Sequence, residues 1–140
     1  MSSTVTGIRW KHVVSAALSV IAMAFLVLVI IIAGYAFALA FQVRGTPDQI
    51  AINHFAARIS PRLMPWLVAV FAFMAACFVA RKPGVSGVTH GLLIGILAGL
   101  LSVAVRLAFG ARLGLHSAIF LLIVAALGWL GGVAGHRSRA

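Results

Sequence analysis

Four glycines recur at every fourth position in the stretch Gly87-Val-Thr-His-Gly91-Leu-Leu-Ile-Gly95-Ile-Leu-Ala-Gly99. On an α-helix, each step of four residues advances about 400°, so these glycines form one stripe that climbs ~18 Å. Glycine costs ~1 kcal/mol relative to alanine inside a helix, which makes a regular repeat of glycine unfavourable without compensation. In membranes the compensation is close approach of a second helix, for which GxxxG spacing is typical. The stretch therefore predicts a glycine-zipper helix packed against a neighbour.

Composition indicates that the rest of the chain is also built for a bilayer. Of its 140 residues, 64% are hydrophobic and 9% are charged, and its mean hydropathy is +1.18. Ordinary soluble domains are only ~45–50% apolar. Eleven Lys and Arg against one acid, Asp48, give a net charge of +10. These cations are scattered at the ends of apolar segments, so we interpret them as topology signals and contacts to anionic lipids, with no nucleic-acid partner.

The apolar segments predict an all-α integral membrane four-helix bundle that forms a single membrane domain over residues 1–140. About 20 residues cross the hydrocarbon, and the predicted spans are about 13–43, 63–80, 85–105 and 113–133. The first is much longer than needed, so we expect residues 36–43 to rise above the bilayer and pack against other protein. An alternative is a signal peptide, since alanines at 36, 38 and 40 have A-x-A spacing. Its apolar region would be far longer than the usual ~7–15 residues, which favours a retained span.

The segment between the first two spans carries the signals of a helix start. Thr46 fits the N-cap position and Gln49 completes a capping box, while Asp48 suits the positive end of the helix dipole. Apolar residues then follow at helical spacing up to Ser60-Pro61, where the helix is expected to end. The prediction is a short amphipathic interfacial helix over about 47–59.

The fourth span has its own set of small residues, in two interleaved pairs four apart: Gly128, Gly131, Gly132 and Gly135. A short turn near Gly110 joins the third and fourth spans, so they should pack antiparallel. Gly91 lies 19 positions before that turn and Gly128 lies 18 after it, while Gly87 and Gly132 lie 23 before and 22 after. The two clusters are therefore predicted to meet in the inner half of the membrane. The alternative is that the third-span stripe faces outward as an oligomer interface.

The basic residues predict a multi-pass protein of the cell membrane with both termini in the cytoplasm. Four spans place both termini on one side, and cytoplasmic loops carry an excess of Lys and Arg. The opposite face holds five arginines, so a reversed topology stays open. The six basic residues predicted to contact headgroups on the inner side are Arg9, Lys11, Arg81, Lys82, Arg137 and Arg139.

The residues that carry chemistry are sparse. No acid lies within a predicted span, which argues against a proton-coupled exporter, because such carriers keep ionisable groups inside the membrane. His12 and His90 fall near the inner ends of spans and would be the candidates for haem or metal ligation. They lack a carboxylate to orient either ring, so interfacial or packing roles are preferred. The serines lack a base with an orienting acid. We therefore predict no catalytic residue, no metal site and no cofactor.

The pattern of four spans, glycine-rich third and fourth helices and basic tails resembles small four-span, glycine-rich bacterial inner-membrane proteins of uncharacterised function. The resemblance covers mainly residues 85–135 and implies no activity. The glycine pattern favours a non-enzymatic membrane protein that acts through helix association, as an accessory subunit, an assembly factor or a homo-oligomer. The alternative is a small oligomeric channel or transporter, because one bundle of four helices has little room for a pathway.

Overall fold

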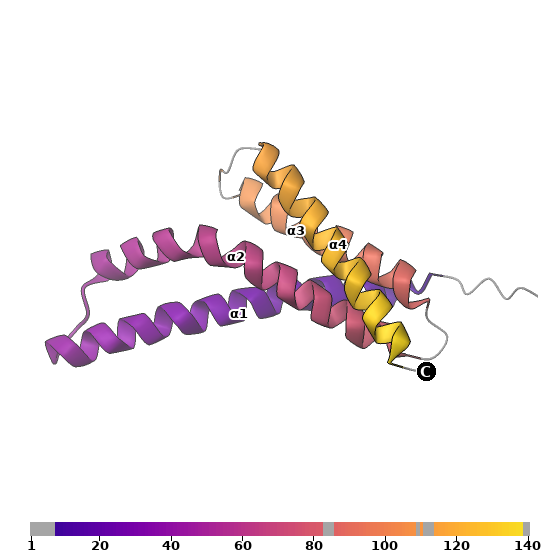
Figure 1. Ribbon diagram of the computed structural model, residues 1–140. Helices are drawn as coiled ribbons and strands as arrows, with labels where there is room; N and C mark the ends of the chain where they lie inside the picture. The colour runs from indigo at the N-terminus through magenta and orange to yellow at the C-terminus, as the bar shows by residue number, and fades with distance from the viewer. Residues whose placement is uncertain (1–7, 83–85, 109, 111–113, 139–140) are drawn as a thin grey trace, which may run out of the picture.

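The computed structural model describes residues 8–82, 86–108, 110 and 114–138, and within these residues the chain is helical without any strand. The helices are α1 (Trp10–Val43), α2 (Gln49–Ala80), α3 (Gly87–Ala108) and α4 (Leu115–Arg137) (Figure 1). Each is long and apolar enough to cross a membrane. The all-α prediction is therefore confirmed, and the helices are compatible with a multi-pass membrane protein. The predicted starts of spans three and four, at 85 and 113, lie outside the described residues.

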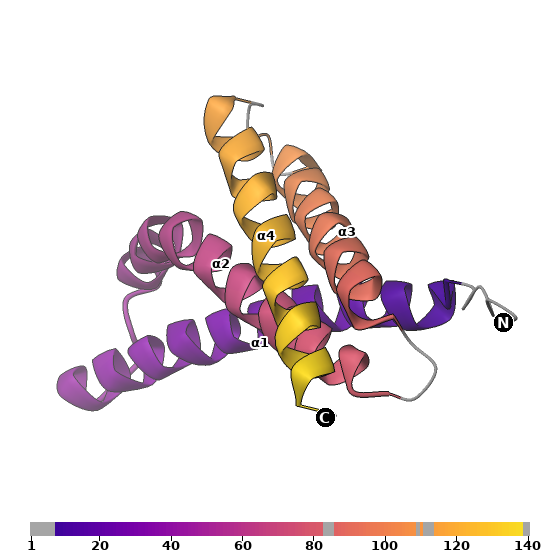
Figure 2. The same cartoon turned by 45° about the vertical axis from the view of Figure 1, so that its right-hand side comes forward.

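The four helices are arranged as two hairpins that share one end. α4 contacts α2 and α3, whereas α1 contacts α2 and α3 but, among the described residues, not α4. The far part of the α1–α2 hairpin projects away from α3 and α4 (Figures 1 and 2). The molecule is therefore closely packed where α1 and α3 begin and α2 and α4 end, and it is forked at the opposite end.

The predicted interfacial helix over 47–59 is wrong, because α2 runs unbroken from Gln49 to Ala80 and includes both that segment and the predicted second span. Its N-cap is Asp48 rather than Thr46, since an Asp48 carboxylate oxygen accepts a hydrogen bond from the Ile50 backbone N–H at 2.9 Å. Asp48 thus satisfies a backbone donor that has no partner within the helix.

Proline does not end α2 where the sequence analysis expected it to. Pro61 and Pro65 both lie inside the helix. Proline removes a backbone hydrogen bond, yet apolar helices tolerate it because leaving the helix would leave more backbone groups without partners. The Ser60 hydroxyl donates to the Ala56 carbonyl oxygen at 2.7 Å, as a helical serine can when its neighbourhood lacks water. Figure 1 shows α2 changing direction along its length, which is the usual effect of proline in a helix.

Small side chains fill much of the core. On α1, Ala17 and Ala24 are fully buried, and they belong to a cluster that includes Ala72 of α2 and Ala98 of α3. Nearer the shared end, Val13, Val79 and Ile94 form a second cluster. Because lipid is as apolar as these side chains, the gain lies in close packing of helices rather than in hiding apolar area from water.

The two helices stay in contact within the projecting part of the α1–α2 hairpin. The rings of Tyr35 and Phe55 stack with centroids 3.9 Å apart and link the two helices. Arg44 then ends α1 in the left-handed conformation, with φ 50°, and its backbone N–H bonds to the Ala40 carbonyl oxygen. Beyond the stacked pair, Phe37 and Phe41 are exposed, which leaves this face of α1 open to its surroundings.

Candidate functional site

The backbones of α3 and α4 approach each other closely. A Cβ atom built on Gly91 would lie 2.5 Å from the Gly128 carbonyl oxygen and 2.8 Å from Gly132 Cα. A Cβ built on Gly128 would likewise lie 2.5 Å from the Gly91 carbonyl oxygen. Real Cβ atoms do not come within 3.0 Å of such atoms. Only glycine fits at these positions while the helices keep this separation.

The same interface continues one turn to either side of Gly91. A Cβ on Gly87 would lie 2.9 Å from the Gly132 carbonyl oxygen, and a Cβ on Gly95 would lie 2.6 Å from the Val124 carbonyl oxygen. At Gly99 the nearest atom is a side-chain carbon of Leu121 at 3.5 Å, an ordinary contact. The helices are therefore closest from Gly87 to Gly95, near the shared end, and a leucine fills the space beyond. The pairing of Gly91 with Gly128 and of Gly87 with Gly132 agrees with the one predicted by counting residues from Gly110.

A second face of α4 packs just as closely on α2. A Cβ on Gly131 would overlap the Phe73 carbonyl oxygen, and a Cβ on Gly135 would overlap the Cys77 carbonyl oxygen and lie 2.8 Å from the Ala80 Cβ. The glycine spacing in the sequence did not predict this contact. The signal was the small-residue spacing of α2 itself, where alanines recur at 72, 76 and 80. Each pair of α4 glycines therefore serves a different neighbour.

The eight glycines are buried in the monomer. Those of α3 face α4, so the alternative in which the third-span stripe points outward does not describe this structure. Their arrangement makes the glycine interface, defined here as Gly87, Gly91, Gly95 and Gly99 with Gly128, Gly131, Gly132 and Gly135, an internal contact among α2, α3 and α4. Any association with another protein must use other surfaces.

His90 lies beside this interface with both ring nitrogens engaged. It is 1% exposed; its Nδ1 is 3.0 Å from the Ser86 carbonyl oxygen, and its Nε2 is 3.2 Å from the Arg9 backbone nitrogen. A neutral imidazole donates through one nitrogen and accepts through the other, so this network assigns the proton to Nδ1 and lets Nε2 accept from Arg9. His90 thus links the residue before α1 to α3. In the described part of the chain, no group of three or more His, Cys, Asp or Glu side chains could hold a metal.

The predicted headgroup residues gather at the shared end. Arg9 and Lys11 flank the start of α1, Arg81 and Lys82 follow α2, and Arg137 ends α4. All five are exposed, while Arg139 lies outside the described residues. Lys82 extends over the Phe78 ring, with its Nζ 5.9 Å from the centroid. Contact of these cations with lipid headgroups stays a prediction.

The fold and these contacts define the class of molecule: a tightly packed set of apolar helices held by backbone contact at glycine. Comparison of the chain with models of known families, with curated proteins and with solved structures found no match. The function must therefore be inferred from the surfaces and contacts of the molecule itself.

Proposed function

We propose that this chain is a non-enzymatic integral membrane protein that acts through helix association, as an accessory subunit, an assembly factor or a homo-oligomer. Because the glycine interface is used inside the monomer, the surface that meets the partner is the projecting part of the α1–α2 hairpin. The supporting observation is the exposure of α1 there. Phe37 is 73% exposed, Phe41 is 79% exposed, and no atom lies within 4 Å of a Cβ built on Gly34.

The length of α1 argues that lipid alone does not cover this end. The uncharged run from 13 to 43 is 31 residues, or about 46 Å of helix, against ~30 Å of hydrocarbon. Tilts of membrane helices reach about 40°, at which this run would still span ~36 Å. Roughly 6 Å of apolar helix would then stand outside the hydrocarbon. Exposed phenylalanines at that level are stabilised by another protein or a second copy of this one.

Site-specific crosslinking tests the proposal. A photo-crosslinking amino acid is placed at Phe37 or Phe41, and in a control at Leu122 of α4, which is 68% exposed. In native membranes, we expect a discrete protein adduct from the two α1 positions and only lipid adducts from Leu122. An adduct of twice the chain mass would identify a homo-oligomer, and a different mass would identify a partner subunit. Lipid adducts alone at all three positions would contradict the proposal.

The alternative, a small oligomeric channel or transporter, makes a different prediction for the pure protein. Reconstituted into liposomes, a channel would conduct ions or solutes selectively, whereas an accessory subunit would not. A selective flux that disappears when the α1 surface is altered by Phe37→Ala would favour the channel and would replace the accessory role.

A further inference from the structure

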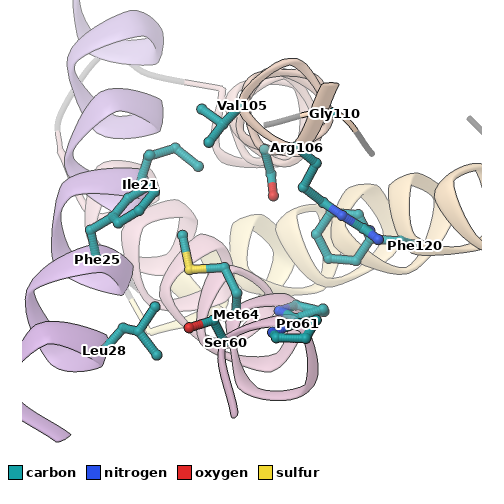
Figure 3. A pocket seen from close by; sticks show the side chains of 12 residues that line it. Ile21, Phe25, Leu28, Ser60, Pro61, Met64, Val105, Arg106, Gly110 and Phe120 are labelled. Atoms are coloured by element: carbon teal, nitrogen blue, oxygen red, sulfur yellow. The ribbon is translucent and has the colours of Figure 1, made fainter. Parts of the chain in front are cut away.

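The fork between the two hairpins encloses a cavity of about 520 Å³, which we call the fork cavity (Figure 3). All four helices contribute to its wall. The apolar part of the wall includes Ile21, Phe25 and Leu28 of α1, Met64 of α2 and Phe120 of α4. Its volume falls in the ~300–1,000 Å³ range of small-molecule sites. The cavity is therefore large enough for part of an apolar ligand.

Two polar side chains of α3, those of Ser102 and Arg106, line the same cavity. Ser102 is 4% exposed, and its hydroxyl makes no hydrogen bond within the part of the chain that the structure describes. Arg106, half-buried, makes no hydrogen bond or ion pair with any described residue. The two residues are one helical turn apart and so lie on one face of α3. A hydroxyl and a half-buried guanidinium that line an apolar cavity favour a ligand that brings acceptor oxygens.

The depth of these groups matches that of lipid phosphates. Arg106 is 19 positions after Gly87, or about 28 Å along α3, and the hydrocarbon is ~30 Å thick. With Gly87 near one interface, the guanidinium lies near the other. Ser102 lies about 6 Å deeper along α3, a separation comparable to that between the phosphate and the glycerol esters of one phospholipid. A soluble anion would meet Arg106 but would leave Ser102 and the apolar wall without contacts.

Charge indicates an anionic ligand. The only acid of the chain, Asp48, caps α2 and is exposed, and the net charge is +10. The sequence has no other acidic side chain that could pair with Arg106. Guanidinium binds phosphate oxygens through paired hydrogen bonds. A second, smaller cavity of about 250 Å³ lies beside Arg106 and Phe120 and leaves room for the headgroup side of such a ligand.

We propose that the fork cavity binds one anionic phospholipid. Its phosphate accepts hydrogen bonds from Arg106, a glycerol-ester oxygen accepts from the Ser102 hydroxyl, and an acyl chain lies against Phe25 and Phe120. Such a lipid would fill the space between the hairpins and fix the angle of the fork. This inference is independent of the partner surface at the end of α1.

Native mass spectrometry of the detergent-solubilised protein, equilibrated with equal amounts of phosphatidylglycerol and phosphatidylcholine, tests the site. We expect one phosphatidylglycerol bound with at least about fivefold preference, the ratio that one basic residue near lipid provides. Arg106→Gln should abolish the preference. The matched control is Arg62→Gln, because Arg62 is an exposed arginine of α2 that does not line either cavity. It should retain the preference.

A second variant separates loss of the site from loss of the fold. Leu28→Trp fills the cavity from α1 and leaves both polar groups in place, so it should also release the lipid, while its circular dichroism stays helical. Equal binding of the two lipids by the unchanged protein would overturn the proposal. So would equal losses in Arg106→Gln and Arg62→Gln, or displacement of the lipid by glycerol phosphate, which would show that only the headgroup is recognised.

Discussion

Replacing Gly91 by alanine should force α3 and α4 apart. The new Cβ would lie 2.5 Å from the Gly128 carbonyl oxygen, and ordinary Cβ contacts begin near 3.4 Å, so the deficit is 0.9 Å. The atoms it would meet belong to the backbone, which cannot rotate away as a side chain can. Either the helices separate or the contact is strained. Overpacking of this kind costs ~1–3 kcal/mol.

Alanine also has an opposite effect that must be separated from the clash. It favours the helix by up to ~1 kcal/mol over glycine, so the net loss in the free energy of unfolding is expected to be about 1–2 kcal/mol. Gly99→Ala is the matched control. It lies on the same helix and stripe and gains the same propensity, but its Cβ would meet Leu121 at an ordinary 3.5 Å. We expect Gly99→Ala to be neutral or slightly stabilising.

Reversible unfolding in mixed micelles of increasing SDS mole fraction, followed by circular dichroism, measures the difference between the two variants. We expect Gly91→Ala to unfold at a clearly lower SDS fraction than Gly99→Ala. If the two variants unfold together, the backbones of α3 and α4 do not approach as described, and the glycine interface is not what holds them.

Three further outcomes are expected. His90→Ala removes a buried side chain and leaves the backbone N–H of Arg9, the N-cap of α1, without its acceptor, so it should lower the free energy of unfolding by ~2 kcal/mol or more in the same SDS titration. Asp48→Ala removes the cap of α2 and should cost ~1 kcal/mol there, whereas Asp48→Asn should retain most of it. An impermeant maleimide should label Ser3→Cys and Ser138→Cys from the cytoplasmic side only, when each is made in a background without the native cysteine. Labelling of the two positions from opposite sides would exclude an even number of spans.

The contact between α3 and α4 could be predicted from sequence because glycine spacing and chain length determine it together. The short connection around Gly110 requires antiparallel packing, and counting from it brings Gly91 level with Gly128. The contact of α4 with α2 was not predicted, because only the spacing of glycines, and not that of alanines, was used to find close helix contacts. Where a glycine supplies the close approach, its partner needs only a small side chain, and Ala76 and Ala80 meet that need.

The course of α2 could not be read from local signals. Ser60-Pro61 is a good helix stop in water, where a freed carbonyl can bond to solvent. In the structure the same pair continues the helix, and the Ser60 hydroxyl donates a hydrogen bond to the carbonyl one turn back. The predicted N-cap residue was wrong for a related reason. Thr46 and Asp48 are both good N-cap residues, and only the structure shows that Asp48 takes this position. The fork cavity joins residues from all four helices and has no local signature.

The two glycine-lined faces of α4 have a consequence for how the protein is made. Of the four helices, α4 leaves the ribosome last, and its final turns carry four glycines, each of which weakens an isolated helix by ~1 kcal/mol. Those turns are stabilised only by a groove that α2 and α3 form together, since Gly128 and Gly132 meet α3 while Gly131 and Gly135 meet α2. We therefore expect the helices to assemble in sequence, with α2 and α3 packing side by side before α4 packs against both. A chain stalled at that stage would present an open groove lined by bare backbone, which is the state that membrane quality-control proteases would have the opportunity to recognise.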